Sequence, residues 1–195
     1  MMKLAIVGGI GSGKSVVSRM LGIMGVPVYD CDSRAKELMV QDPHIVKELK
    51  RMFGEECYNA DGGLNRGYLA SCIFVDERNT RRVNALVHPV VKADFCAWAQ
   101  GQKNAPVVAV ETALLYESGM ADVVNRVLLV WTEKETAVAR TMSRSGMSRT
   151  QVLNRMAKQM STDDLLLLTD CSIYNGGSNA VMPAVLELLG ELLGK

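Results

Sequence analysis

Hydrophobic positions along this chain follow two patterns, which predict strands and helices. Five short, largely apolar runs predict buried strands, at residues 3–7, 26–29, 105–111, 126–131 and 171–174. Between these runs, apolar side chains recur every three or four residues, which is the spacing of amphipathic helices. Because strand and helix alternate, we predict an α/β fold with a five-stranded parallel sheet and helices on both faces, in three layers.

The longest helical stretch, residues 34–104, contains no predicted strand. Pro43 breaks it, Gly54 ends its second helix, and a long helix begins near Thr80. Pro89 lies inside that long helix and is expected to kink or restart it. The stretch is longer than a crossover between parallel strands requires. We therefore predict an inserted helical subdomain.

A second, smaller helical segment follows the fourth predicted strand. One helix is predicted over residues 133–144, and Gly146 ends it. Ser148 and Gln151 have the spacing of a capping box, which predicts another helix as far as Met160. We assign a small helical lid to residues 140–160. The lid and the helical subdomain belong to one domain, whose core comprises residues 1–33, 105–139 and 161–195.

The clearest chemical signal lies between the first strand and the helix that follows it. Residues 8–15 read Gly-Gly-Ile-Gly-Ser-Gly-Lys-Ser, which fits the P-loop pattern in its expected context of strand, loop and helix. The glycines let backbone N–H groups converge on phosphate at the positive end of the helix. Lys14 would reach the β- and γ-phosphates, and the Ser15 hydroxyl would bind Mg²⁺. The alternative is a glycine-rich turn with a chance lysine, but the context favours a nucleoside triphosphate site.

Composition limits the class of protein. The net charge of +1 provides no overall attraction to nucleic acid or membrane, and no apolar run approaches the roughly 20 residues of a membrane span. Five cysteines without a Cys-x-x-Cys pair indicate reduced thiols, and two histidines do not favour a zinc site. The chain enters its first strand at once, so we expect no cleavable signal and a cytoplasmic protein.

Three features each have two interpretations. Asp32 follows the second strand, where ligands bind in α/β sheets, yet Asp32 or Ser33 equally fits the N-cap of the next helix. His88, at the expected bend, fits a structural hydrogen-bonding role better than a reactive one. A group of arginines forms either a solvated helix face or a phosphate-facing lid. These arginines are Arg140, Arg144, Arg149 and Arg155.

Further motifs occur in a fixed order along the chain. They are Tyr-Asp-Cys-Asp at 29–32, Asp-Gly-Gly-Leu-Asn-Arg at 61–66, His-Pro at 88–89, Leu-Leu-Tyr-Glu at 114–117, Arg-x-x-x-Arg at 140–144 and Asn-Gly at 175–176. With these motifs the chain resembles the dephospho-coenzyme A kinase family over essentially its whole length. The P-loop alone indicates only a superfamily, whereas the ordered set is much more specific.

The resemblance implies an enzyme that uses ATP and Mg²⁺ to phosphorylate the ribose 3′-hydroxyl of dephospho-coenzyme A, the last step of coenzyme A synthesis. Its partners would be small molecules, without nucleic acid or membrane, and the chain a monomer or weak homo-oligomer. The family's catalytic base matches Asp32, while Lys14 and Arg140 would offset charge on the transferred group. The remaining implied residues are Gly9, Gly11, Ser12, Gly13, Ser15, Val16, Arg144 and Asn175 for ATP, Ser15 for the metal, and Asp32, Arg66, His88 and Leu115 for the acceptor.

Three positions depart from the family pattern. Ala113 replaces a proline, which suggests a less rigid loop; Ser145 replaces an aspartate and removes an ion pair; and Val16 replaces the commoner threonine. None of these changes removes a group that the chemistry requires. The closest rival is another small-molecule or nucleotide kinase of the same fold. A nucleotide switch is disfavoured because no Asn-Lys-x-Asp or Asp-x-x-Gly motif occurs, and a non-catalytic module because Lys14, Ser15 and Asp32 are intact.

Overall fold

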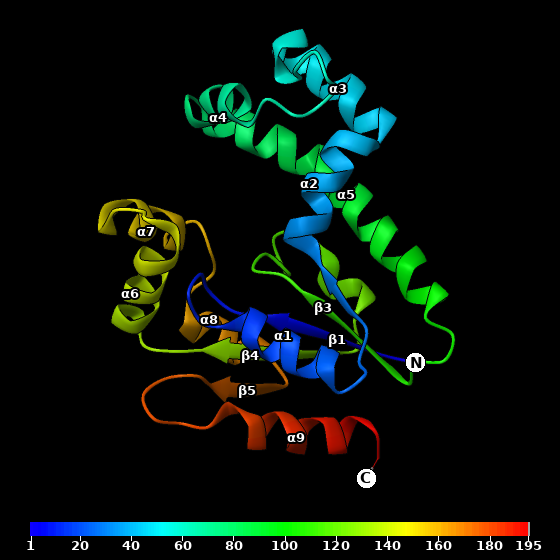
Figure 1. Cartoon of the computed structure of the whole chain (residues 1–195), viewed down its shortest axis with the longest axis vertical. Helices are drawn as coiled ribbons and strands as arrows, with labels where there is room; N and C mark the ends of the chain where they lie inside the picture. Colours follow the sequence, from blue (N-terminus) through cyan, green and yellow to red (C-terminus); the bar gives the residue numbers. More distant parts are fainter. Residues whose placement is uncertain (195) are drawn as a thin grey trace. The chain divides into compact units, whose positions relative to one another are not determined.

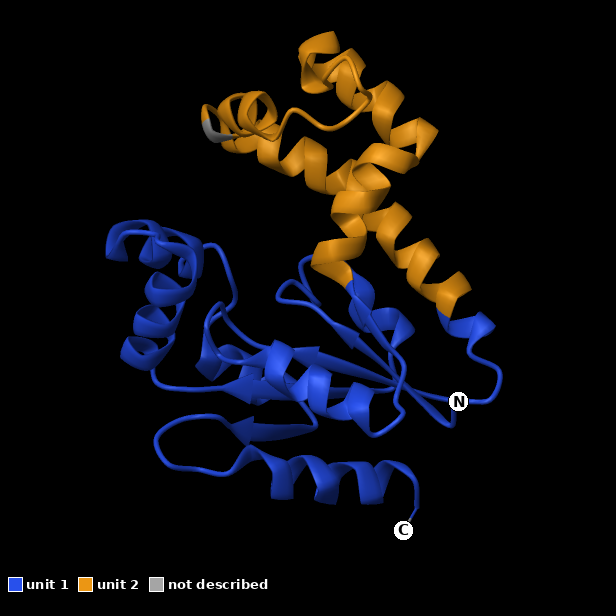
Figure 2. Cartoon of the chain, in the orientation of Figure 1, with its two compact units in different colours: residues 1–30, 99–195 blue, residues 31–98 orange. Residues whose placement is uncertain are grey.

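The computed structural model describes residues 1–194, with Phe74 described by its backbone alone. The chain forms two compact units, which are coloured separately in Figure 2. The core unit comprises residues 1–30 and 99–195, and the helical unit comprises residues 31–98. The first boundary lies where the second strand ends and the helices begin, and the second lies inside a long helix, shortly before the chain returns to the sheet.

The core unit contains the predicted five-stranded parallel sheet (Figure 1). The strands are β1 (Met2–Val7), β2 (Val28–Asp30), β3 (Val107–Glu111), β4 (Arg126–Trp131) and β5 (Cys171–Tyr174). Their order is β2-β3-β1-β4-β5, so β1 is the middle strand and pairs with both β3 and β4. The loop after β1 therefore begins at the centre of the sheet's carboxyl edge, where ligands bind in such folds.

Both faces of β1 are buried. Leu4 and Ile6 belong to the hydrophobic cluster that the sheet forms with helices α1 (Lys14–Ile23) and α9 (Val181–Leu192). Ala5 and Val7 alternate with them, lie on the opposite face of the sheet, and are also buried. This burial on both sides explains why the strands of the core read as near-continuous apolar runs.

The remaining helices of the core unit lie after β3 and β4. They are η2 (Met120–Val123), α6 (Lys134–Ser145), α7 (Arg149–Met156) and α8 (Thr162–Leu168). The capping box of Ser148 and Gln151 is confirmed at the start of α7. The predicted extent of that helix is wrong, because α7 ends at Met156 and a separate helix, α8, begins after Ser161.

The helical unit contains α2 (Cys31–Gln41), α3 (Pro43–Phe53), η1 (Glu55–Cys57), α4 (Arg66–Phe74) and most of α5 (Glu77–Gly101). The expected restart at Pro89 does not occur, since α5 runs through it without a break. Proline removes the bond to the carbonyl of Ala85 and can kink a helix. Both residues lie on the exposed side of α5, so water can satisfy that carbonyl.

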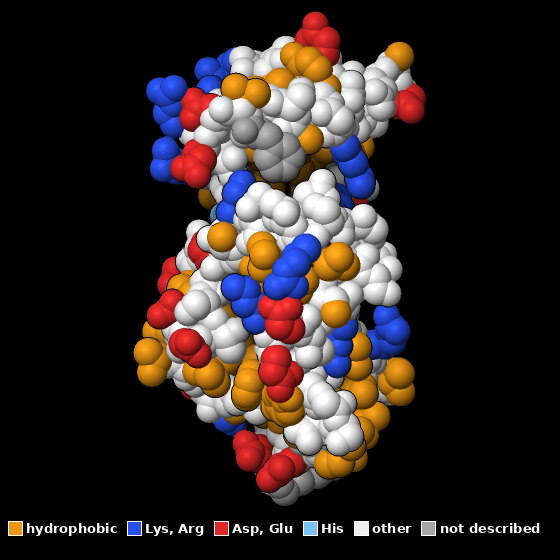
Figure 3. Space-filling view, turned by 90° about the vertical axis from the view of Figure 1, so that its left-hand side faces the viewer, with side chains coloured by type: hydrophobic (Ala, Val, Ile, Leu, Met, Phe, Trp, Pro, Cys, Tyr) orange, Lys and Arg blue, Asp and Glu red, His pale blue; other side chains and the backbone are white. Residues whose placement is uncertain are grey.

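Surface charge follows the near-neutral composition. On the face drawn in Figure 3, lysine and arginine side chains are interspersed with aspartate and glutamate. Among the described residues, no helix is both long enough and apolar enough to span a membrane.

Candidate functional site

Three glycines of the P-loop are required by the backbone and by packing. Gly8, Gly11 and Gly13 have φ angles of 149°, 80° and 96°, which side chains rarely adopt. A Cβ at Gly8 would also overlap the carbonyl of Val130 in β4, and one at Gly11 would overlap the carbonyl of Ala137 in α6. The tight curve of the loop therefore requires glycine at these positions, and the loop packs closely against β4 and α6.

Lys14 is the first residue of α1, directly after the left-handed N-cap Gly13. Its Nζ donates to the carbonyl oxygens of Gly8 and Gly9, at 2.7 and 3.1 Å. The ammonium group thus lies across the mouth of the loop. Ser15 is exposed in the same first turn of α1, where the N-terminal end of the helix dipole favours anions.

Asn175 and Arg140 connect the P-loop to β5 and α6. The Nδ2 of Asn175 donates to the carbonyl of Ser12 at 2.9 Å, and Arg140 Nη1 donates to the carbonyl of Asn175 at 2.8 Å. Two residues that the resemblance implied for ATP and for charge compensation are therefore joined to the loop in one chain of hydrogen bonds. Ser12 itself is buried, and its hydroxyl has no hydrogen-bond partner.

The P-loop also contacts a residue that the sequence did not single out. Gln159, in the turn between α7 and α8, accepts a hydrogen bond from the N–H of Ile10 through Oε1 at 3.0 Å. The next residue, Met160, donates its N–H to Oε1 of Glu117 at 3.3 Å. Glu117 belongs to the Leu-Leu-Tyr-Glu motif, so that motif supports the turn that contacts the P-loop.

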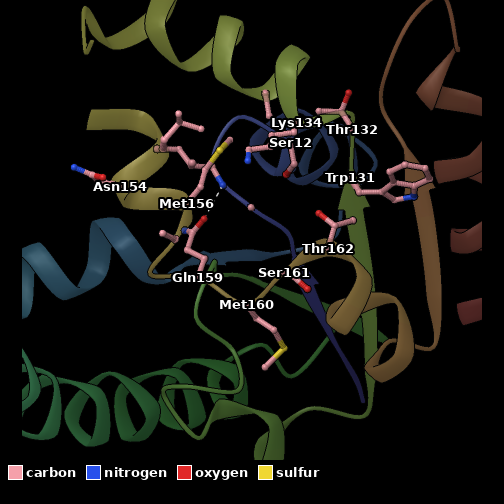
Figure 4. Close-up of a pocket in the computed structure, with 15 residues that line it drawn as sticks. Ser12, Trp131, Thr132, Lys134, Asn154, Met156, Gln159, Met160, Ser161 and Thr162 are labelled. Atoms are coloured by element: carbon pink, nitrogen blue, oxygen red, sulfur yellow. Dashed lines mark hydrogen bonds between the residues drawn. The ribbon is translucent and has the colours of Figure 1, made fainter. Parts of the chain in front are cut away.

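A cavity of about 670 Å³ opens between these elements. Its walls come from the P-loop, the end of β4, the start of α6, helix α7 and the turn before α8. Figure 4 draws the lining residues as sticks and labels most of them. Gly9 and Ser12 are the two implied ATP residues that line it. Trp131, Leu153 and Met156 make part of the wall apolar, as is usual in small-molecule sites.

The lid arginines divide into different roles. Arg149 makes a two-point ion pair with Glu135, with N–O distances of 2.7 and 2.8 Å, and so joins α7 to α6. This contact makes Arg149 structural. Arg144 and Arg155 are exposed in the last turns of α6 and α7. Among the described residues, Arg140 is the arginine of these four that hydrogen-bonds to the P-loop network, through the carbonyl of Asn175.

An aromatic pair lies at the carboxyl ends of β4 and β5. The rings of Trp131 and Tyr174 are 4.8 Å apart between centroids and tilted by 48°. The hydroxyl of Tyr174 donates to Glu133, and this bond raises the pKa of Tyr174 and lowers the pKa of Glu133 relative to their ordinary values. Gly176 is buried against both groups, and a Cβ there would overlap the tyrosine hydroxyl.

Asp32 lies in the first turn of α2, in the helical unit. Helix α2 begins at Cys31, directly after β2 ends at Asp30, so Asp32 is not the N-cap that one interpretation suggested. Its side chain is exposed. A negative charge at this position interacts favourably with the N-terminal end of the helix dipole.

The rest of the helical unit holds α2 in place and carries two implied acceptor residues. Arg34 makes a two-point contact with Asp94 of α5, with nitrogen–oxygen distances of 2.8 and 2.9 Å. Arg66 is exposed at the first position of α4, which Asn65 caps, and His88 lies half-buried midway along α5.

Leu115 does not fit its implied role. Its side chain is 1% exposed in the core unit, so the expected contact with the acceptor is not supported. The loop around Ala113, which was expected to be less rigid, contains two hydrogen bonds. The N–H of Leu114 donates to Thr112 Oγ1 at 3.1 Å, and Tyr116 donates its hydroxyl to the carbonyl of Leu168 at 2.6 Å. The first bond is local to the loop, and the second ties the loop to α8.

Acidic residues end β2 and β3, the two strands on one side of β1. Asp30 is the last residue of β2 and is paired in register with Glu111, the last residue of β3. Glu111 is in turn in register with Ile6, two residues before the P-loop. Carboxylate and hydroxyl oxygens are the donors that Mg²⁺ prefers. These two carboxylates lie at the carboxyl edge of the sheet, and sequence reasoning named neither of them as a candidate for the metal.

Comparisons with known proteins found relatives along almost the whole chain. The family model for dephospho-CoA kinase matches residues 2–180. A dephospho-CoA kinase from Bacteroides fragilis is 38% identical over 194 residues, covering 100% of this chain and 94% of its own. One from Porphyromonas gingivalis is 36% identical and covers 97% of this chain and 93% of its own.

Solved structures show the same fold. A crystal structure from Thermus thermophilus is similar with a TM-score of 0.82 and 33% identity, covering 99% of this chain and 96% of the other. A dephospho-CoA kinase from Campylobacter jejuni has a TM-score of 0.73 at 20% identity, covering 97% and 96% of the two chains, and it supports the fold alone. On the strength of the family model and of full-length relatives above 30% identity, this chain belongs to the dephospho-CoA kinase family.

Proposed function

We propose that this chain transfers the γ-phosphoryl group of ATP to the ribose 3′-hydroxyl of dephospho-coenzyme A, giving coenzyme A and ADP, the last step of coenzyme A synthesis. The observation that carries the proposal is the match of the family model over residues 2–180. A complete P-loop at the centre of the sheet supports it, with Lys14 and Ser15 at the start of α1.

Phosphoryl transfer passes through a loose transition state, so the protein must mainly align the reactants and offset charge. In this proposal the N–H groups of the P-loop and the ammonium of Lys14 bind the phosphates. Arg140, which the carbonyl of Asn175 already holds beside the loop, offsets charge on the transferred group. Asn175 and the half of the cavity around Trp131 hold the rest of the nucleotide.

A magnesium ion fits the donors at the carboxyl edge of the sheet. Ser15 would hold it, with the carboxylates of Asp30 and Glu111 close in the sheet register. When bound, the ion supplies positive charge to the β- and γ-phosphates. The role of these residues is to fix its position relative to the P-loop.

Asp32 acts as the base in this proposal. As the 3′-oxygen forms its bond to the γ-phosphorus, the bond from that phosphorus to the β,γ-bridging oxygen breaks and ADP leaves. The hydroxyl proton passes to the carboxylate of Asp32. The helical unit, through Arg66 and His88, supplies contacts to the acceptor.

The direct test is a mass-spectrometric assay of the purified protein with ATP, Mg²⁺ and dephospho-coenzyme A. The expected result is coenzyme A, with the added phosphate on the 3′-oxygen of the ribose. Shikimate serves as a control acceptor, because shikimate kinases share the fold. ATP turnover that leaves dephospho-coenzyme A unmodified would contradict the proposal and favour a kinase with another acceptor.

A further inference from the structure

Gln159 contacts the P-loop at Ile10. Its Oε1 accepts the N–H of Ile10 at 3.0 Å, across 149 positions of sequence. The same oxygen lies 3.8 Å from the point where Gly9 would carry a Cβ. Figure 4 shows the side chain of Gln159 pointing into the cavity toward the loop, with this hydrogen bond dashed. A backbone N–H of the phosphate-binding loop is therefore held by a side chain from the end of the lid.

The turn that carries Gln159 is itself firmly built. The N–H groups of Ala157, Lys158 and Gln159 donate to carbonyls of α7 at 2.9, 3.2 and 3.0 Å. Met160 donates to Glu117, and Ser161 caps α8 by accepting the N–H of Asp164 at 3.1 Å. Every residue of the turn from 157 to 160 thus donates its N–H to a named acceptor.

Glu117 connects this turn to the sheet. Its neighbour Tyr116 donates its hydroxyl to Leu168, the last residue of α8, at 2.6 Å. The loop after β3 therefore holds the chain on both sides of α8, just before it and at its end. Because the turn is fixed in this way, the side chain of Gln159 is suited to hold the P-loop in one conformation.

The other contacts of the P-loop hold different parts of it. Asn175 holds the carbonyl of Ser12, and α6 packs against Gly11. Gln159 holds the N–H of Ile10, between these regions and the end of β1. Glutamine suits this place because its amide oxygen accepts a hydrogen bond without adding negative charge beside the phosphates.

We propose that Gln159 is a positioning residue of the nucleotide site. It fixes the backbone of the P-loop at Ile10 and couples the loop to the lid. The proposal rests on the proposed function only in taking the P-loop as the ATP site. Gln159 acts through the backbone of Ile10, and its loss is expected to weaken the binding of phosphates and not of the acceptor.

The test measures ATP binding to the full chain by calorimetry without acceptor, using Gln159→Ala. Affinity for ATP, and for tripolyphosphate as a probe of the loop alone, is expected to fall about 3- to 10-fold, the effect of one lost hydrogen bond. In the kinase assay, KM for ATP rises by a similar factor while KM for dephospho-coenzyme A is unchanged. Gln151→Ala is the matched control, because it removes a glutamine hydrogen bond from α7, the helix just before the turn of Gln159, without touching the P-loop. It is expected to leave ATP affinity unchanged.

Gln159→Glu provides a second variant that keeps an acceptor for Ile10 but adds charge. Its ATP affinity is expected to be lower than that of Gln159→Ala and to recover partly at high salt, through screening. Unchanged or tighter ATP binding by Gln159→Ala would overturn the proposal, and tighter binding would show that Gln159 competes with phosphate. Equal losses in Gln159→Ala and Gln151→Ala would also overturn it, since they would reflect the lid helix alone. A wild-type chain that binds ATP but leaves dephospho-coenzyme A unmodified would refute the proposed function and leave this inference standing.

Discussion

At the scale of single residues, the chemistry of the site depends on where a few charged groups are placed. The carboxylate of Asp32 lies in the first turn of α2, and the ammonium of Lys14 lies in the first turn of α1. The two groups belong to different compact units, each at the start of a helix. A helix N-terminus stabilises an anion, so Asp32 and a phosphate at Lys14 each have a favourable backbone environment.

Asp32→Asn tests the proposed base. The amide can position the hydroxyl but cannot accept its proton, so kcat and kcat/KM are both expected to fall by about 10²- to 10⁴-fold. ATP affinity and the melting temperature should change little. Asp42→Asn is the control: Asp42 caps α3, and asparagine caps a helix equally well, so its kcat is expected to stay normal. Normal kcat in Asp32→Asn would mean that another group is the base.

Residue-level prediction was possible where the chemistry is local. The P-loop is contiguous, so the roles of its glycines and of Lys14 follow from eight consecutive residues. Gln159 could not be predicted in this way, because its partner Ile10 is 149 positions away and an isolated glutamine carries no signal. Leu115 shows the opposite case, since a motif position implied a contact that its burial in the core does not support.

At the scale of elements, capping residues decide where the lid ends. Ser148 begins α7 and Ser161 begins α8, each accepting a backbone N–H three residues on. The first cap was recognised because Gln151 completes a capping box. The second was missed, because a continuous helix to Met160 was expected. The signal was present in the spacing of Ser161 and Asp164.

Ser161→Ala is expected to destabilise the protein through the loss of this cap. The N–H of Asp164 loses its partner, which typically lowers the free energy of unfolding by about 1 kcal/mol. Urea denaturation measures the change. Ser161→Asn keeps a capping oxygen and is expected to retain most of the stability. Equal stability of the alanine variant and the wild type would show that α8 is held by its contacts with β4 and Tyr116 and not by its cap.

At the scale of the whole molecule, two compact units divide the proposed roles. The core unit carries the P-loop, Arg140, Asn175 and the cavity, and the helical unit carries Asp32. The alternation of strand and helix was enough to predict the sheet, because its buried strands are continuous apolar runs. Strand order and the course of α5 through Pro89 were not predictable from pattern, since both depend on tertiary packing.

Nucleotide binding is expected to stabilise the whole chain. A ligand at 100 times its Kd adds about 2.7 kcal/mol to the free energy of unfolding, so saturating ATP should raise the melting temperature of the wild type. Lys14→Ala should lose most of that rise and at least about 10²-fold in turnover, while keeping its near-UV circular dichroism. Lys47→Ala, which removes an exposed lysine from α3, is the charge-matched control. A full ATP-induced rise in Lys14→Ala would refute the P-loop assignment.

The place of β1 in the sheet has a consequence for folding. It is the middle strand of five, and Leu4, Ala5 and Ile6 are completely buried. Amide hydrogens in such a strand exchange with water only when the whole unit opens. The P-loop begins at the residue after this strand, so the strand that anchors the loop is expected to be among the last parts of the core unit to unfold. A chain whose helical unit has opened locally still offers a phosphate-binding loop. We therefore expect ATP to stabilise the folded core unit even when the helical unit has opened.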